Sequence, residues 1–125
     1  MPWKAAALAV ALAACTGQGT PPAAAQPPAA LVGQWNGSWD ASLPTTLVVE
    51  RVGAGAASVI YEWGVAPAWK IDIPGYERSV ARFDAGRLVV FLTNGAVATY
   101  MLQADGTLHG TYRFRGRIAH ATLRQ

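Results

Sequence analysis

Four tight turns divide residues 79–124, SVARFDAGRLVVFLTNGAVATYMLQADGTLHGTYRFRGRIAHATLR, into five short apolar segments. The turns are Ala85-Gly86, Asn94-Gly95, Asp105-Gly106 and Arg115-Gly116. Asn-Gly and Asp-Gly are strong signals for two-residue hairpin loops, because both residues take positive φ angles there. Between the turns, apolar residues recur at every second position, which is typical of half-buried strands. The stretch therefore predicts a five-stranded antiparallel meander.

Pairing residues outward from each turn, as if it were a two-residue loop, tests this prediction. The expected pairs are Phe83 with Leu88, Leu92 with Val97, Met101 with Gly110, and Tyr112 with Ala119. The face that results is apolar and holds Ala81, Phe83, Leu88, Val90, Leu92, Val97, Thr99, Met101, Leu108, Gly110, Tyr112, Phe114, Ala119, Ala121 and Leu123. The opposite face holds Arg82, Asp84, Arg87, His109, Thr111, Arg113, His120, Thr122 and Arg124. A slip of one residue at any turn mixes the two faces, so the sorting favours one continuous sheet.

The same alternation predicts three further strands nearer the N-terminus. We expect eight strands, at residues 34–40, 46–52, 57–63, 79–84, 87–92, 96–102, 107–114 and 117–124. Eight strands suffice to close a small barrel, and closure removes the exposed sheet edges that promote aggregation. The expected fold is therefore all-β, an antiparallel up-and-down meander that closes into an eight-stranded barrel. A two-sheet sandwich is the alternative.

The first 15 residues have the layout of an export signal. Lys4 precedes a small apolar run of about ten residues, whereas a membrane span needs roughly 20. The run ends in Leu12-Ala13-Ala14-Cys15, which resembles the lipobox of bacterial lipoproteins, where cleavage precedes a cysteine that is then lipidated. The resemblance implies a signal peptide over residues 1–14 and a membrane anchor at Cys15. An ordinary secretory peptide cleaved after Ala13 is the alternative.

The rest of the chain divides into a linker and one domain. Residues 15–30 are expected to form a linker, because after Cys15 they are only Gly, Thr, Gln, Pro and Ala and cannot bury a core. Residues 31–125 are the expected barrel domain, which lacks cysteine and so depends on its apolar core. Thr16 after the cysteine resembles lipoproteins sorted to the outer membrane. We expect that location, facing the periplasm or the surface, or a secreted or periplasmic protein without the lipid.

The first expected strand of the domain carries Gly33-Gln34-Trp35. A Gly-x-Trp on the first strand of an up-and-down barrel resembles the calycin signature shared by lipocalins, fatty-acid-binding proteins and avidins. The resemblance implies that Trp35 closes one end of the barrel and that a basic residue near the last strand, Arg124 or Arg117, lies across it. It also implies a general capacity to bind small molecules. The second lipocalin signature, Thr-Asp-Tyr, is absent.

Aromatic side chains are the main candidates for ligand contacts, since an indole ring offers stacking area and one N–H donor. The candidate ligand-binding residues are Trp35, Trp39, Trp63, Trp69, Tyr76 and Tyr112, with Glu62 and Arg124 as polar partners; Tyr61 and Tyr100 belong to the same aromatic set. The alternative is that Trp35, Trp39 and Tyr112 only fill the barrel. Small residues on the expected inner face, such as Ala81, Thr99, Gly110, Ala119 and Ala121, leave volume for a cavity if they cluster.

The connection over residues 64–76 is the longest in the domain and is too apolar for a solvated loop. Long loops of this kind often cover a site. We expect a lid over one mouth of the barrel with Trp69, Ile71, Ile73 and Tyr76 facing inward. The alternative is an ordinary Ω-loop that caps the core.

Other polar residues suggest less specific roles. Glu50 and Glu62 flank the second hairpin and are expected to face solvent. His109 and His120 fall on the outer face, where two histidines without adjacent Asp, Glu or Cys make a poor metal site. An outer apolar patch is also expected, and such patches often bind partners. Its members are Val80, Val89, Phe91, Ala98, Tyr100 and Leu102.

Sequence motifs of catalysis and cofactor binding are absent. The chain has no Gly-x-Ser-x-Gly elbow, no His-Glu-x-x-His and no phosphate-binding glycine loop, so we expect neither an enzyme nor a cofactor. The net charge of +3 comes from scattered arginines, which does not indicate a nucleic-acid partner. The expected function is binding of a small lipophilic or aromatic ligand. The alternative is a protein-binding module, such as an inhibitor of secreted hydrolases, and a solid core with an exposed apolar loop would favour it.

Overall fold

The structure is a computed structural model and describes residues 26–125. The expected signal peptide, Cys15 and the linker as far as residue 25 lie outside the described residues. The described chain begins with Gln26, and Pro27 is already buried against the domain. A short 3₁₀ turn, η1 (Ala29–Leu31), then leads into the first strand.

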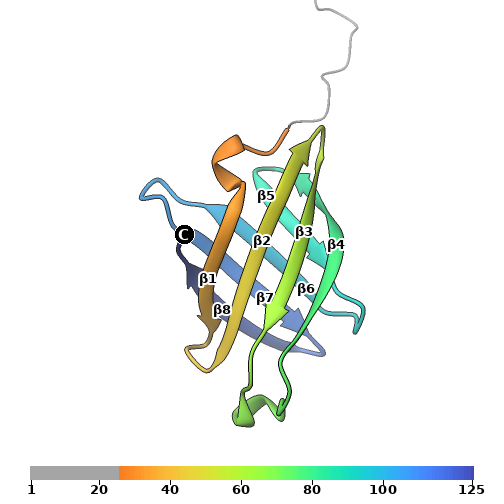
Figure 1. Cartoon of the computed structure of the whole chain (residues 1–125), viewed down its shortest axis with the longest axis vertical. Coiled ribbons are helices and arrows are strands. Elements are labelled where there is room, and N and C mark those ends of the chain that lie inside the picture. Colours follow the sequence, from red (N-terminus) through yellow and green to blue (C-terminus); the bar gives the residue numbers. More distant parts are fainter. Residues whose placement is uncertain (1–25) are drawn as a thin grey trace, which may run out of the picture.

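Eight antiparallel strands follow one another in chain order and form a single sheet (Figure 1). They are β1 (Gly33–Trp39), β2 (Leu43–Gly53), β3 (Ala56–Trp63), β4 (Gly75–Asp84), β5 (Arg87–Phe91), β6 (Val97–Leu102), β7 (Leu108–Phe114) and β8 (Arg117–Leu123). Between β3 and β4 lies a second 3₁₀ turn, η2 (Pro67–Trp69). The expected all-β, up-and-down architecture is confirmed.

The sheet curls until its two edge strands meet, which makes a nearly closed calycin-like barrel. Main-chain groups of Asn36 and Arg124 exchange two hydrogen bonds of 2.9 Å, and the Asp40 N–H donates to the His120 carbonyl at 2.8 Å. Gly37 permits this approach, because a Cβ there would lie 2.6 Å from the carbonyl oxygen of Thr122. One continuous, closing sheet excludes the two-sheet sandwich.

Two of the four C-terminal turns have the expected two-residue form. Ala85 and Gly86 have φ angles of 52° and 78°, and Arg115 and Gly116 have φ angles of 48° and 82°. Positive φ at both central residues is the geometry that matches the twist of the flanking strands. The expected pairs therefore hold here: Phe83 lies opposite Leu88, and Tyr112 lies opposite Ala119.

The other two turns are one residue longer than expected. The Leu92 N–H donates to the Ala96 carbonyl at 2.9 Å, so the loop between β5 and β6 has three residues, ending in Gly95. The Gln103 N–H likewise donates to the Thr107 carbonyl at 2.8 Å, around a three-residue loop that ends in Gly106. A type I turn followed by a glycine with positive φ is the common three-residue hairpin loop.

These two slips reverse the expected faces of β6 alone. Ala98 and Tyr100 are buried inside the barrel, whereas the inward positions expected for Val97, Thr99 and Met101 are wrong. Tyr100 now pairs with Gly110. Because the second slip cancels the first, β7 and β8 keep the expected inner residues, among them Leu108, Tyr112, Ala119 and Leu123. For the same reason Ala98, Tyr100 and Leu102 do not belong to an outer patch.

A β-bulge at Glu50 changes the face of β2 partway along. Val49 pairs with Val59 while Arg51 pairs with Ser58, so Glu50 has no opposite residue. Because of the bulge, Arg51 faces outward like Glu50, and Val52 packs against the core. The Glu50 carboxylate accepts a hydrogen bond of 3.0 Å from Arg78 on the outer face. An extra residue of this kind increases the local bend that a closing sheet needs.

Large side chains fill the interior of the barrel. The bulkiest fully buried ones are Trp35, Trp39, Tyr100, Leu47, Leu88, Leu108 and Leu123. Small inner residues complement them: the ring of Trp39 lies where a Cβ on Gly110 would be only 2.9 Å away. The centre is therefore a packed core, which restricts any ligand to an end of the barrel. Within residues 26–125, no helix is long and apolar enough to span a membrane.

Candidate functional site

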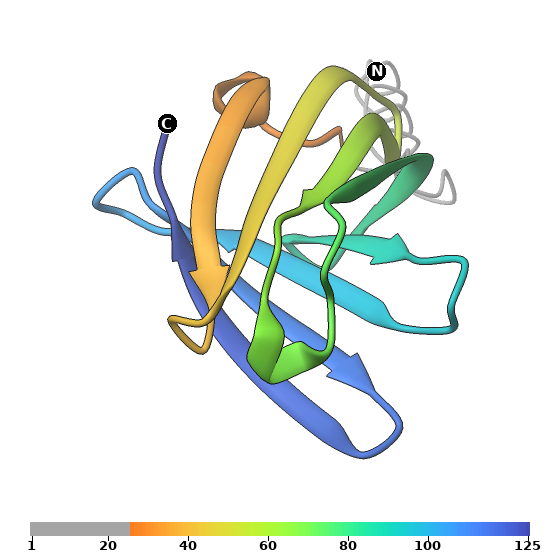
Figure 2. The same ribbon diagram turned by 60° about the horizontal axis from the view of Figure 1, so that its bottom comes forward.

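One end of the barrel is formed by the turns after β1 and β7, the loop after β5 and the long β3–β4 loop (Figure 2). A cavity of about 310 Å³ opens among the strand ends there. Its walls come from six different elements or loops, and the residues that line it are Leu43, Tyr61, Trp63, Ile71, Glu77, Leu92, Thr93, Asn94 and Tyr112. We call this the mouth cavity.

Trp39 closes the core behind the mouth cavity. Its side chain is completely buried, and its indole N–H donates to the Tyr61 hydroxyl oxygen at 2.8 Å. The Trp39 ring also packs against Tyr112, with ring centroids 5.5 Å apart, and against Tyr100 at 6.1 Å. Trp39 therefore lies directly behind two of the lining residues, Tyr61 and Tyr112.

Two inward tyrosines keep their protons well into the alkaline range. Burial raises the pKa of Tyr61 to about 12, although hydrogen bonds with Trp39 and Thr45 oppose the shift. Burial also raises the pKa of Tyr100 well above its usual value. The Tyr100 hydroxyl is buried and has no hydrogen-bond partner among the described residues. The Tyr61 hydroxyl at the cavity is thus a neutral hydrogen-bonding group at physiological pH.

Glu77 supplies a carboxylate to the mouth cavity. It lies on β4 directly opposite Tyr61 on β3, and both side chains point into the barrel. Thr93 on the facing loop holds both carboxylate oxygens: its N–H donates to Oε2 at 3.0 Å and its hydroxyl donates to Oε1 at 3.2 Å. The carboxylate is therefore oriented by two neutral donors.

The β3–β4 loop reaches across the mouth and packs on the opposite wall. Trp69 meets Tyr112 edge to face, with ring centroids 5.9 Å apart, and its indole N–H donates to the Ser42 hydroxyl at 2.8 Å. Ile71 is half-buried and lines the cavity. The loop itself is tied together by the pairing of Ala66 with Ile71. These contacts make the loop a partial cover for the mouth cavity.

The expected inward orientation of Ile73 and Tyr76 is wrong. The exposed fractions of these side chains are 73% and 67%. Tyr76 pairs with the outward Glu62, so it lies on the outer face of β4, while its neighbour Glu77 faces inward. Ile73 precedes the Pro74-Gly75 entry into β4 and projects from the loop. The loop therefore covers the mouth with Trp69 and Ile71 only.

The calycin-type arrangement at Trp35 differs from the expected one. Trp35 is buried, and its indole N–H donates to the Leu31 carbonyl at 2.9 Å, which fastens η1 to the barrel. The Arg124 side chain is exposed, and its main chain serves the junction with Asn36. The arginine that stacks on an indole is Arg117, whose guanidinium lies 3.5 Å from the ring centre of Trp69.

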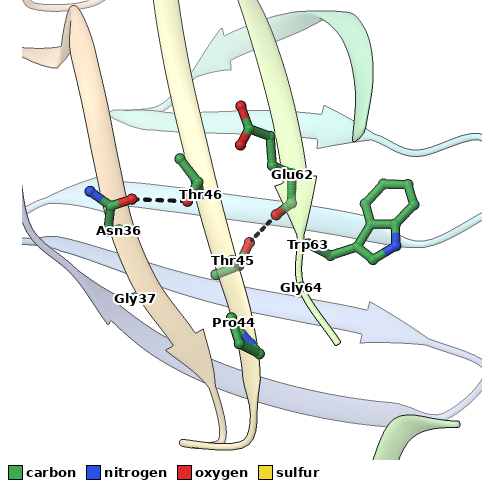
Figure 3. Close-up of a pocket in the computed structure, with 8 residues that line it drawn as sticks. All are labelled: Asn36, Gly37, Pro44, Thr45, Thr46, Glu62, Trp63 and Gly64. Atoms are coloured by element: carbon green, nitrogen blue, oxygen red, sulfur yellow. Dashed lines mark hydrogen bonds between the residues drawn. The ribbon is translucent and has the colours of Figure 1, made fainter. Parts of the chain in front are cut away.

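Glu62 lines a second hollow, on the outside of the barrel. Figure 3 shows Glu62 and Thr46 on neighbouring strands, with the Thr46 hydroxyl donating to the side-chain oxygen of Asn36 at 2.9 Å. This outer groove also encloses about 310 Å³, but its other lining residues are mostly Gly, Pro and Thr. Trp63 borders both hollows. Glu62 therefore lies on the outer face with Tyr76 and does not line the mouth cavity.

The two histidines form a stacked pair on the outer face. The rings of His109 and His120 are 5.8 Å apart and inclined by 26°. Within the part of the chain that the structure describes, no group of three or more His, Cys, Asp or Glu side chains is placed to hold a metal ion.

No family model, curated protein or solved structure matches this chain. The candidate site is therefore inferred from the cavity and its contacts in this structure. The structure brings together three of the expected residues, since Trp63 and Tyr112 line the mouth cavity and Trp69 packs on the ring of Tyr112. Trp35 and Trp39 belong to the core, whereas Tyr76, Glu62 and Arg124 lie outside.

Four lining residues were missed by the sequence reasoning: Glu77, Thr93, Asn94 and Leu43. A signal for Glu77 was present, because counting back from the inward Ala81 in steps of two reaches Ser79 and then Glu77. The expected turn contains only Asn94 and Gly95, whereas the observed three-residue loop begins at Thr93, and Thr93 and Asn94 both line the cavity.

Proposed function

We propose that this protein is a non-enzymatic binding protein that holds a small, mainly apolar or aromatic molecule in the mouth cavity. The observation that carries the proposal is the cavity wall itself. It combines aromatic and aliphatic side chains with a few convergent polar groups, which is the usual composition of a ligand pocket.

The size of the cavity limits the ligand. Its volume of about 310 Å³ is at the lower end of the range for small-molecule sites, about 300–1,000 Å³. The buried ring of Trp39 and the packed core prevent a long acyl chain from entering the barrel. A compact molecule of one or two rings, held at the rim beneath Trp69 and Ile71, fits these dimensions.

A dye titration tests this proposal. Prodan, an uncharged two-ring aromatic dye, should gain fluorescence on binding, and Trp63→Ala should weaken binding because it removes an aromatic wall. Tyr76→Ala is the matched control, since Tyr76 belongs to the same sheet but faces solvent. Equal dye affinity of wild type and Trp63→Ala, or weaker dye binding in Tyr76→Ala alone, would contradict binding in the mouth cavity.

A second candidate function is protein binding through the β3–β4 loop. The core is solid, and the loop and its exit expose Val65, Ile73 and Tyr76, with exposed fractions of 48%, 73% and 67%. Exposed apolar side chains grouped in this way are characteristic of partner surfaces. An inhibitor of a secreted hydrolase would use such a loop as a wedge. Inhibition of lysozyme or a secreted protease, abolished by Ile73→Asp, would favour this function over the first.

We also propose that the protein is anchored to a membrane through a lipidated Cys15, on the outer membrane if the host has two membranes. The Leu-Ala-Ala-Cys ending of the N-terminal segment supports this. Mass spectrometry of the membrane fraction should detect a diacylated cysteine at the mature N-terminus, and Cys15→Ser should release the protein from that fraction. An unmodified N-terminus beyond Cys15 would contradict the anchor.

A further inference from the structure

The wall of the mouth cavity carries an unbalanced negative charge. Among residues 26–125, Glu77 is the only carboxylate that lines the cavity, and no Lys, Arg or His of this part of the chain lines it. Residues 26–125 contain one ion pair, between Arg78 and Glu50, and it lies on the outer face of the barrel. Within the described part of the chain, Glu77 therefore has no cationic partner.

The hydrogen bonds of Glu77 orient the carboxylate without neutralising it. Both donors come from Thr93, a neutral residue, and they reach the two oxygens at 3.0 and 3.2 Å. A carboxylate has about four acceptor positions, so further positions remain for a ligand. Because Thr93 holds both oxygens, the Glu77 carboxylate keeps one orientation in the cavity.

Aromatic rings stand beside this carboxylate. Tyr61, Trp63 and Tyr112 line the same cavity, and the rings of Tyr61 and Trp63 are 6.0 Å apart at an angle of 39°. The faces of such rings attract cations, and ammonium groups bind well where several rings enclose them. This end of the barrel already uses the effect, since Arg117 stacks on Trp69 outside the cavity.

We infer that the mouth cavity selects an organic cation, an amine or ammonium group attached to a small apolar body. The ammonium group is held between Glu77 and the rings of Tyr61, Trp63 and Tyr112, and the apolar body contacts Leu43, Ile71 and Leu92. The inference rests on the proposed ligand-binding function and adds the charge of the ligand to it.

A matched pair of probes tests the charge preference. Benzylamine and benzyl alcohol share one ring and differ in charge at neutral pH, and calorimetry or NMR titration gives the affinity of the full chain for each. We expect benzylamine to bind about tenfold more tightly or better, because cation–π contact and the carboxylate both favour it. Glu77→Gln should remove that preference and retain binding of benzyl alcohol. Glu62→Gln, on the outer groove, should change neither affinity.

Each outcome separates the two proposals. Equal affinity for both probes, or a preference that survives Glu77→Gln, would overturn selection of a cation and leave binding in the cavity intact. Binding of neither probe would overturn the proposed function as well. If Glu77→Gln fails to fold, salt titration of the wild-type chain replaces it: the affinity for benzylamine must fall as the salt concentration rises, while that for benzyl alcohol must not.

Discussion

Gly110 is the inner residue on which the packing around Trp39 depends most directly. A Cβ at this position would lie 2.9 and 3.1 Å from two ring atoms of Trp39 and 3.3 Å from the ring of Tyr100. Both rings are fully buried and cannot move aside without displacing their neighbours. Gly110→Ala should therefore lower the free energy of unfolding by about 1–3 kcal/mol, measured by urea denaturation.

Gly53 provides the control for that substitution. It lies at the end of β2, and a Cβ there would meet no atom within 4 Å. Gly53→Ala should leave the free energy of unfolding within about 1 kcal/mol of the wild-type value. A similar loss of stability in both variants would mean that steric exclusion by Trp39 is not the cause.

Two buried tyrosines differ in how their hydroxyl groups contribute to the stability of the core. The Tyr61 hydroxyl accepts the indole N–H of Trp39 at 2.8 Å, whereas the Tyr100 hydroxyl has no partner among residues 26–125. Tyr61→Phe should destabilise the protein by about 1–3 kcal/mol, because it leaves a buried donor unsatisfied. Tyr100→Phe should be neutral or stabilising, since a buried, unpaired hydroxyl is unfavourable. Thermal or urea unfolding measures both variants. A larger loss of stability for Tyr100→Phe than for Tyr61→Phe would contradict this prediction.

Among the secondary-structure elements, the two three-residue loops show how the strand faces are set. The loop before β6 and the loop after it each add one residue, so only β6 changes face relative to the expected pattern. Alternation along β6 is uninformative here, because Val97, Ala98, Met101 and Leu102 are apolar on both faces. In the register that forms, the buried ring of Tyr100 packs over Gly110.

Shortening the β6–β7 loop tests this account. Deletion of Ala104 leaves Asp105-Gly106 as a two-residue loop between Gln103 and Thr107, which are already hydrogen-bonded. Asp-Gly suits the two-residue turn, so the deletion should preserve the fold and change the free energy of unfolding by no more than about 1 kcal/mol. Deletion of Thr99 should instead unfold the domain, because it moves the flanking inner residues to the wrong face. Near-ultraviolet circular dichroism and urea unfolding distinguish the two results.

Across the whole molecule, the fold places the mouth cavity at one end of the barrel and the packed core in the centre. Eight strands enclose enough space for their own side chains or for one small ligand, and here large side chains such as Trp35 and Trp39 fill the interior. The mouth cavity lies at the end where four connections meet, and loops can vary there without disturbing the core. This division explains why the site residues lie at strand ends and in loops.

The buried tyrosines also predict how the stability of the whole barrel depends on pH. The pKa of Tyr61 is about 12 in the folded state against a usual value of 10.0, so the folded protein retains a proton that the unfolded chain loses. Stability is thus fully present below pH 10 and is lost as the pH rises from 10 toward 12, by about 2–3 kcal/mol for Tyr61. Tyr100 acts in the same direction. Urea midpoints between pH 9 and pH 11.5 should fall in the wild type.

A variant in which Tyr61 and Tyr100 are both replaced by Phe is the control for this pH dependence. It lacks the two shifted groups, so its urea midpoint should fall less steeply over the same range. An equally steep fall would assign alkaline unfolding to other groups.

The amino-acid order was sufficient for the strand count, the antiparallel succession and the inner faces of β4, β5, β7 and β8, because these follow from local alternation and turn chemistry. The alternation along β4 also places Glu77 on the inner face. Only the tertiary structure decided the face of β6 and the meeting of Glu77 with Thr93 and the aromatic rings. Those features depend on one-residue differences in loop length and on how large rings share a closed interior. Both are set by contacts between segments far apart in the chain, which no local pattern records.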